Sequence, residues 1–286
     1  MADIISIAKN IFENKKADII IGYTKATSEG RTRPVVIRNS EEVSNLVLNS
    51  SCLNNLATYL TRRENKGRKV AIVAKGCDIK AIVQLIAESQ IKRENVYIIG
   101  VRCNGVKRGF EGEDSKKIAE KCLTCNVKTP HLSDEIADMN DDGLSGKDEK
   151  GELIAKIDAM TAEERFSFWE EQFKKCIKCY ACRQACPLCY CERCIADKSM
   201  PRWIETSPTG RGNFAWNIVR AFHLSGRCIG CNECERVCPA GIPLSLLNRK
   251  MAMVAKTEFG YESGMNPEAP TLIGTYDLKD KEEFIK

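Results

Sequence analysis

The sequence predicts an α/β domain at the N-terminus, with a small and mainly parallel sheet, followed by an all-α domain and an irregular C-terminal tail. Apolar runs typical of strands alternate with helical patterns in the first half of the chain. No strand pattern occurs over residues 152–255, and most of the 16 cysteines in the 286-residue chain fall there. We expect three parts, at residues 1–150, 151–258 and 259–286.

The N-terminal part contains a predicted βαβ unit. An amphipathic helix over residues 3–14 precedes two short strands at 18–23 and 35–37, which flank a polar turn. One or two helices are expected over 41–64, with Ser40 as a plausible N-cap. A strand at 69–74, a helix at 78–89 and a strand at 96–101 then complete the unit, so these two strands should be parallel.

Four cysteines follow the ends of these two strands. Cys77 comes just after the first strand and Cys103 just after the second, and the pair Cys122 and Cys125 follows one short helix later. The carboxyl ends of parallel strands share one edge of a sheet, where open α/β folds build their sites. The four thiols therefore predict an iron–sulfur cluster at this edge. The alternative is that Cys77 and Cys103 are buried core thiols and that the pair is incidental.

The chain changes character after the predicted sheet. Residues 133–151 are acidic and rich in Gly, Asp and Ser, which is typical of a linker or a surface excursion. Helical apolar patterns then occupy 152–175 and 214–223, and a further helix begins near 242. The second domain is therefore expected to be all-helical.

Two copies of the pattern C-x2-C-x2-C-x3-C-P dominate this second domain. They comprise Cys176, Cys179, Cys182 and Cys186, and Cys228, Cys231, Cys234 and Cys238. The pattern holds 4Fe-4S clusters, and the fourth cysteine of each run usually serves the other cluster. Cys238 should therefore join the first three cysteines of the first run, and Cys186 those of the second. Structural zinc and disulfides are the alternatives, but zinc sites favour two separated C-x2-C pairs.

Three further cysteines lie directly after the first run, at Cys189, Cys191 and Cys194. The eight positions of the two ferredoxin clusters are already taken, so these thiols could hold another cluster with a ligand from elsewhere. Cys52 is the one cysteine left, and sixteen thiols would then divide into four sets of four. A small zinc site, or thiols that merely pack, are the alternatives.

Composition excludes several functional classes. The formal net charge of +5 comes from 44 basic and 39 acidic residues that are too evenly scattered to indicate nucleic-acid binding. Two histidines in the chain make histidine-based acid–base catalysis a poor prediction, and we expect no catalytic side chain. The sequence has no signal-peptide pattern and no apolar run long enough to span a membrane. We expect a cytoplasmic protein of an anaerobic host.

Two resemblances extend this interpretation. With 41 residues between Cys186 and Cys228, residues 152–256 resemble the all-helical two-cluster ferredoxin domain of succinate dehydrogenase iron–sulfur subunits and heterodisulfide reductase small subunits. The N-terminal part resembles the beta-subunit family of coenzyme F-420 (deazaflavin) hydrogenases and formate dehydrogenases. The matching segments are Lys75-Gly76-Cys77-Asp78, Ile99-Gly100-Val101-Arg102-Cys103 and Lys121-Cys122-Leu123-Thr124-Cys125.

The second resemblance implies a cluster beside a flavin. FAD would then lie near Lys75 and Gly76, with the lysine placing positive charge near the reduced flavin, although a solvated lysine at a strand end is an equal alternative. Without FAD, the sequence predicts an electron-transfer subunit with three or four 4Fe-4S clusters in a hetero-oligomeric complex. Its catalytic partner would be a formate dehydrogenase, a hydrogenase or a heterodisulfide-reductase-like flavoprotein. With FAD, the chain itself would reduce a deazaflavin or nicotinamide. Trp203, Phe214 and Trp216 are candidates for docking, or for the helical core.

Overall fold

The N-terminal part is built on a five-stranded sheet with the order β2-β1-β3-β4-β5. The structure, a computed structural model, describes residues 3–140, 142–198, 200–274 and 278. β1 pairs antiparallel with β2, whereas β1, β3, β4 and β5 are parallel neighbours. The strands are β1 (Ile19–Lys25), β2 (Thr32–Ile37), β3 (Val70–Ala74), β4 (Val96–Arg102) and β5 (Glu135–Asp138). The predicted small, mainly parallel sheet is confirmed.

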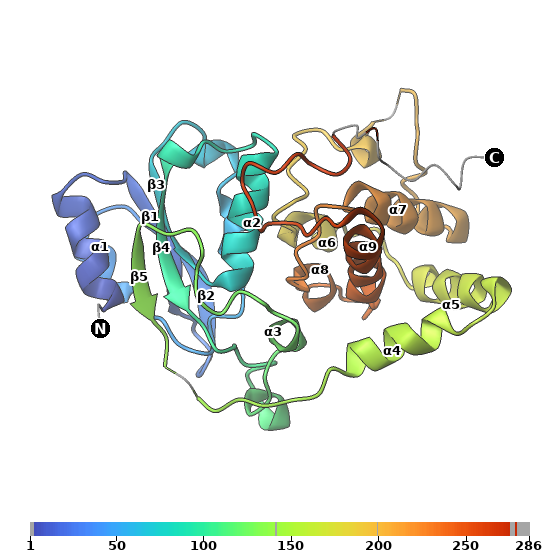
Figure 1. The fold of residues 1–286 in the computed structure, drawn as a ribbon, viewed down its shortest axis with the longest axis horizontal. Coiled ribbons are helices and arrows are strands. Elements are labelled where there is room, and N and C mark those ends of the chain that lie inside the picture. The colour runs from blue at the N-terminus through green and yellow to red at the C-terminus, as the bar shows by residue number, and fades with distance from the viewer. Residues whose placement is uncertain (1–2, 141, 199, 275–277, 279–286) are drawn as a thin grey trace.

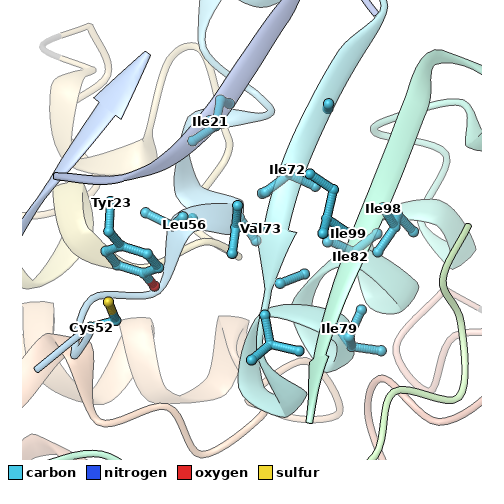
Figure 2. Packing of buried hydrophobic residues seen from close by; sticks show 14 of the residues in the cluster. Ile21, Tyr23, Cys52, Leu56, Ile72, Val73, Ile79, Ile82, Ile98 and Ile99 are labelled. Atoms are coloured by element: carbon cyan, nitrogen blue, oxygen red, sulfur yellow. The ribbon is translucent and has the colours of Figure 1, made fainter. Parts of the chain in front are cut away.

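Helices α1 (Ile4–Glu13) and α2 (Gly76–Ala87) flank the sheet on opposite sides (Figure 1). Figure 2 shows Ile72 and Val73 of β3 and Ile98 and Ile99 of β4 packing near side chains of α2. β3, α2 and β4 form the predicted βαβ unit, with Val70 opposite Val96. The carboxyl end of β3 runs directly into α2, so Cys77 lies in the first turn of that helix.

The segment 41–64 is not α-helical, and this expectation was wrong. It forms short 3-10 helices at Ser40–Asn45, Leu56–Tyr59 and Arg63–Asn65, and the first is capped by Asn39 rather than Ser40. The segment is rich in Asn and Ser, whose side chains hydrogen-bond to nearby backbone groups in competition with a helix. The Asn55 side chain, for example, accepts from the backbone N–H of Ala57. The irregular path turns the backbone carbonyls of Leu53 and Asn54 inward.

The predicted linker at 133–151 contains a strand, which is a second correction. β5 pairs with β4 over Ile99↔Glu135 to Arg102↔Asp138 and forms one edge of the sheet. Its four residues are too short and too polar to give an alternating pattern. Tertiary contacts specify it instead, because Asp134 accepts from the Ile98 N–H at 2.7 Å and Lys16 pairs with Glu135 at 3.1 Å.

The second half is helical over the described residues, as predicted. Its helices are α4 (Glu149–Asp158), α5 (Ala162–Lys174), α6 (Ala181–Ala185), α7 (Gly210–His223), α8 (Glu233–Arg236) and α9 (Leu244–Phe259), and a 3-10 turn occurs at Ile195–Asp197. The N-terminal part also contains the short helix α3 (Glu120–Leu123) and 3-10 turns at Arg93–Asn95 and Gly112–Ser115. Leu188, Leu224 and Ile229 of the helical half are buried in the same core cluster as the sheet. The two halves therefore share a packed interface.

The segment after α9 returns to the α/β domain and runs beside α2 (Figure 1). Tyr261 Oη hydrogen-bonds to Gln84 at 3.2 Å, and Glu262 pairs with Lys80 of α2 at 3.1 Å. Gly264, at φ +78°, lies so close to Lys80 that a Cβ would be 2.2 Å from its carbonyl oxygen. Of the expected tail at 259–286, residues 275–277 and 279–286 lie outside the described residues.

Candidate iron–sulfur sites

The two cysteine runs adopt the same backbone conformation 52 positions apart. Lys178 (φ 56°) and Tyr180 (φ 57°) in the first run are left-handed, as are Gly230 (φ 70°) and Asn232 (φ 55°) at the corresponding positions of the second. A left-handed residue costs about 1–2 kcal/mol unless it is glycine, so its persistence indicates a constraint on the fold. The two runs therefore fold as equivalent turns.

Side-chain hydrogen bonds hold the first turn in place. Lys178 is buried and its Nζ donates to the carbonyl oxygens of Glu205 at 2.7 Å and Gly212 at 2.9 Å. The Asn213 amide, on α7, donates to the carbonyl of Cys176 at 2.8 Å. Helix α7 therefore fixes the backbone of the first cysteine run.

The structure groups the eight cysteines in the crossed manner. Burial raises the pKa of the Cys182 thiol, and its cysteine neighbours Cys176, Cys238 and Cys179 raise it further. Cys238, from the second run, thus lies with the first three cysteines of the first run. α6, which contains Cys182, lies against α8, which ends two residues before Cys238.

The second set encloses a cavity. Cys186, Cys228, Cys231 and Cys234 line one space together with apolar side chains that include Leu188, Leu224 and Ile229. Burial raises the pKa of Cys234 to about 12, and Cys186 and Cys228 add to the rise. Four thiols around one largely apolar space fit the ligand set of a 4Fe-4S cluster. Among the described residues, no three His, Cys, Asp or Glu side chains lie close enough for a single metal ion.

Arg220 lies between the two sets. It is 4% exposed, and its Nη2 donates to the Cys182 carbonyl at 3.1 Å. Its guanidinium is an electrostatic neighbour of Cys182, Cys186 and Cys234, and its Nε has no hydrogen-bond partner within the described part of the chain. A buried cation needs negative charge nearby, which cysteine thiolates supply. Arg220 shares the buried face of α7 with Asn213 and Asn217, so the apolar pattern of the sequence did not mark it as a residue of the site.

The third set gathers at the carboxyl edge of the sheet, as its order in the chain indicates. Cys77 begins α2, Cys103 follows β4, Cys122 lies in α3 and Cys125 follows it. Burial raises the pKa of Cys103 to about 11, with Cys122 and Cys125 among its neighbours. Burial also raises the pKa of Cys77, to which Cys122 contributes. All four thiols therefore belong to one neighbourhood.

Glycine makes this convergence sterically possible. A Cβ on Gly76 would lie 1.8 Å from the carbonyl oxygen of Val127, and one on Gly105 would lie 2.4 Å from Ile118. The segment that carries Cys122 and Cys125 is thus packed directly against the start of α2. A backbone bond from Cys103 N to the Lys128 carbonyl, at 2.9 Å, closes the same segment onto β4.

Lys75 and Gly76, the residues tentatively expected near a flavin, are buried in this structure. Lys75 is 1% exposed and its Nζ lies 2.9 Å from Asp78, which is 0% exposed. The same Nζ contacts the Tyr23 hydroxyl and donates to the Asn54 carbonyl at 3.1 Å. Burial opposes the charge on Lys75, but Asp78 and nearby thiols outweigh it and raise its pKa. Both residues therefore make internal contacts beside Cys77.

A buried ion pair joins the third set to the ferredoxin runs. Lys121 Nζ lies 3.5 Å from Glu233, and the two side chains are 4% and 3% exposed. Lys121 also donates to the Leu53 carbonyl at 2.6 Å and is an electrostatic neighbour of Cys77 and Cys122. Glu233 lies between Cys231 and Cys234 in sequence and also pairs with Arg236 at 2.6 Å. Nothing in the sequence around Lys121 or Glu233 predicts this contact, because the two residues are far apart in the chain.

Two cavities lie at the interface between the N-terminal α/β half and the helical half. One, of about 190 Å³, is lined by Cys77 and Cys125 of the third set together with Cys228 of the second. The other, of about 340 Å³, adjoins Cys231 and is lined by charged side chains of both halves, which include Arg108, Lys121, Glu120, Lys150, Glu235 and Arg236. The third set and the second set are therefore neighbours across the interface.

The structure separates Cys52 from the other three remaining thiols. Cys189, Cys191 and Cys194 line a single cavity, and Cys52 is not among its lining residues. Cys52 is 0% exposed and lies beside Tyr23 in the α/β core (Figure 2). Its Sγ accepts from the Asn49 N–H at 3.5 Å, and burial raises its pKa. The arithmetic that grouped Cys52 with this set has no support in the geometry.

The three aromatic residues considered for docking differ in their exposure to solvent. Trp203 is 64% exposed, whereas Trp216 is 3% exposed and packs edge-on against Tyr180 at 4.9 Å between centroids. Phe214 packs between Phe166 and Phe173. Trp216 is thus a core residue, Phe214 is partly buried against the core, and Trp203 is the most exposed of the three.

A family model described as a 4Fe-4S dicluster domain matches residues 157–243, a range that holds both cysteine runs. This match supports the two-cluster ferredoxin part that the cysteine runs predict. The whole chain is similar to the F420-dependent formate dehydrogenase subunit beta of Methanocaldococcus jannaschii, with 24% identity over 94% of this chain and 93% of that protein. It is also similar to the F420-dependent formate dehydrogenase 1 subunit beta of Methanococcus maripaludis, with 23% identity over 95% and 92%. The expected resemblance to formate dehydrogenase beta subunits is confirmed. No helix in the described residues has the length and apolar character to cross a membrane.

Proposed function

We propose that this chain is the iron–sulfur electron-transfer subunit of a formate dehydrogenase complex. The dicluster domain and the similarity to formate dehydrogenase beta subunits over nearly the whole chain support this assignment. The observation that carries it is the cavity shared by Cys77, Cys125 and Cys228, because it makes thiols of both halves neighbours. A relay of electrons requires such contiguous sites.

The sites have a defined order. The third set (Cys77, Cys103, Cys122 and Cys125) adjoins the second (Cys186, Cys228, Cys231 and Cys234), and Arg220 connects the second to the first (Cys176, Cys179, Cys182 and Cys238). Cys179 of the first set is exposed, whereas Cys103 and Cys122 of the third are buried. The order therefore leads from the interior of the α/β domain to the surface of the helical domain.

When bound, each 4Fe-4S cluster accepts and releases one electron. The thiolates hold it, and the apolar lining excludes water. Lys121 places a buried positive charge beside Cys77 and Cys122, and Arg220 places one between the first two sets. Positive charge near an anionic site stabilises its reduced form, so these residues set potentials. No side chain is required to act on a substrate.

The complex is proposed to be hetero-oligomeric, with a catalytic subunit that oxidises formate. The names of the relatives favour formate over the hydrogenase and heterodisulfide-reductase-like alternatives. All 16 cysteines are free thiols, which suits the reduced cytoplasm of an anaerobe.

A flavin-bearing beta subunit that reduces coenzyme F-420 or a nicotinamide is the second candidate. The relatives are named F420-dependent, and the 340 Å³ cavity beside Cys231 falls in the size range of ligand pockets. The cationic lining would suit phosphates of FAD. Lys150 there is already paired with Glu120 at 2.9 Å and Glu235 at 2.7 Å, and these pairs would have to exchange. For this reason the flavin enzyme ranks second.

The test is an anaerobic purification of the tagged chain from its host, followed by formate addition. A co-purifying catalytic subunit and formate-dependent reduction of the cluster signals in electron paramagnetic resonance (EPR) would support the proposed function. A chain that purifies alone, with clusters that formate does not reduce in the cell extract, would contradict it. Stoichiometric FAD and reduction of coenzyme F-420 by the complex would move the flavin candidate to first place.

A further inference from the structure

Cys189, Cys191 and Cys194 form a compact thiol site that the three-set relay does not use. They occupy six residues after the first run, and all three line one cavity bounded by α7. This cavity measures about 40 Å³, compared with about 20 Å³ between the four thiols of the second set. These three thiols therefore face one common cavity, as the four thiols of the second set do.

An unpaired buried cation faces the same cavity. Arg220 lines both this cavity and that of the second set, and Cys189 is an electrostatic neighbour of its guanidinium. Arg183 and Arg227 also line the cavity, but they are paired with Asp197 at 2.8 Å and Glu88 at 3.0 Å. Among the described residues, Arg220 has no carboxylate partner and its Nε has no acceptor. Its charge indicates negative groups on both sides, which thiolates bound to metal would provide.

The geometry favours a cluster over the other uses of three thiols. The cysteines are free, which excludes disulfides as their arrangement here. Zinc sites favour two separated C-x2-C pairs, whereas these three thiols form a single C-x-C-x2-C run. His223, on α7, lines the same cavity. It is the one side chain besides the cysteines in this lining that could ligate iron, as imidazole does in Rieske-type iron–sulfur sites.

We propose that Cys189, Cys191 and Cys194, completed by His223, hold a fourth iron–sulfur cluster, and that Cys52 is a structural core thiol. Cys191 is exposed, so this cluster lies at the protein surface beside the first two sets. The relay then has a second surface site, distinct from that at Cys179. The inference concerns the metal site alone and holds whichever partner the complex contains.

The experiment measures iron, sulfide and zinc in the anaerobically purified full chain and in four variants. Wild type is expected to contain about sixteen irons with equal sulfide and no stoichiometric zinc. The triple variant C189S/C191S/C194S should lose about four irons and an equal amount of sulfide. C52S is the matched control, because a serine hydroxyl can keep the Asn49 N–H contact, and it should lose none. C122S/C125S reports the third set separately.

The spectra make the result independent of folding. The EPR signals of the two ferredoxin clusters serve as an internal check, and they should persist in the triple variant. H223A should keep the cluster but shift its signal, since a nitrogen ligand is lost. About twelve irons in wild type that fall to eight in C122S/C125S, or stoichiometric zinc that disappears in the triple variant, would overturn the proposal. Loss of iron in C52S would overturn the role of Cys52, and an unchanged spectrum in H223A would overturn that of His223.

Discussion

Replacing Lys75 by methionine tests whether this residue is a counter-ion of the core or part of a ligand site. The substitution removes the cation and leaves Asp78 with 0% exposure and no ion-pair partner. At 2.9 Å and an effective dielectric constant near 20, the lost attraction is about 6 kcal/mol. The carboxylate keeps hydrogen bonds from the backbone N–H groups of Leu56 at 2.5 Å and Lys75 at 3.0 Å. The net loss should therefore be about 3–5 kcal/mol, the usual cost of breaking a buried pair.

Hydrogen exchange measured by mass spectrometry is the appropriate assay, because cluster loss makes global unfolding irreversible. The amides of β3 and α2 should exchange roughly 150- to 4,000-fold faster in K75M, since each 1.4 kcal/mol is a factor of ten. K69M is the control, because Lys69 is exposed at the other end of β3. Adding D78N to K75M should recover part of the protection. Exchange in K75M equal to that in K69M would refute the counter-ion role.

Three further predictions concern the metal sites. C186S should disturb the second cluster and C238S the first, so EPR of the two variants should show loss of different signals; loss of the signal of its own run in each variant would contradict the crossed ligand sets. K121M should shift the potential of the third cluster to more negative values in an EPR redox titration, since a buried cation that favours the reduced form is removed; an unchanged potential would rule out this role for Lys121. G76A should lower iron content by about four per chain, because its Cβ would collide with the Val127 carbonyl and displace the segment that carries Cys122; full iron content would show that this segment adapts.

Local sequence was sufficient to predict the features that depend on the spacing of residues along the chain. The cysteine runs are readable because their ligands lie within eleven residues and the turns between them repeat, as the left-handed pairs at 178 and 180 and at 230 and 232 show. The βαβ unit is readable because β3 and β4 are continuous apolar runs with a helical pattern between them. Covalent neighbourhood and periodicity are properties of the chain itself.

The structure of residues 41–64 and of β5 could not be predicted from the sequence, because it depends on contacts with distant residues. Residues 41–64 have helical apolar spacing, but their Asn and Ser side chains hydrogen-bond to nearby backbone groups, as Asn55 does with the N–H of Ala57. The carbonyl of Leu53 also turns inward and accepts a hydrogen bond from Lys121, which the periodicity of the sequence does not indicate. β5 forms on contacts with β4 and with Lys16, which lies far away in sequence. In both cases tertiary contacts outweigh local preference.

The sequence by itself predicted the cysteine sets as candidate metal ligands, and it determined the α/β and helical halves and the convergence of Cys77 and Cys103 at one sheet edge. Only the tertiary structure decided which charged residues accompany them. It buried Lys75 against Asp78, paired Lys121 with Glu233 across the interface, and placed Arg220 among thiols of two runs. The physical reason is that the cost of burying a charge depends on partners from distant segments. The packing of the two halves determines those partners, and the partners in turn determine the electrostatic environment of the proposed cluster sites.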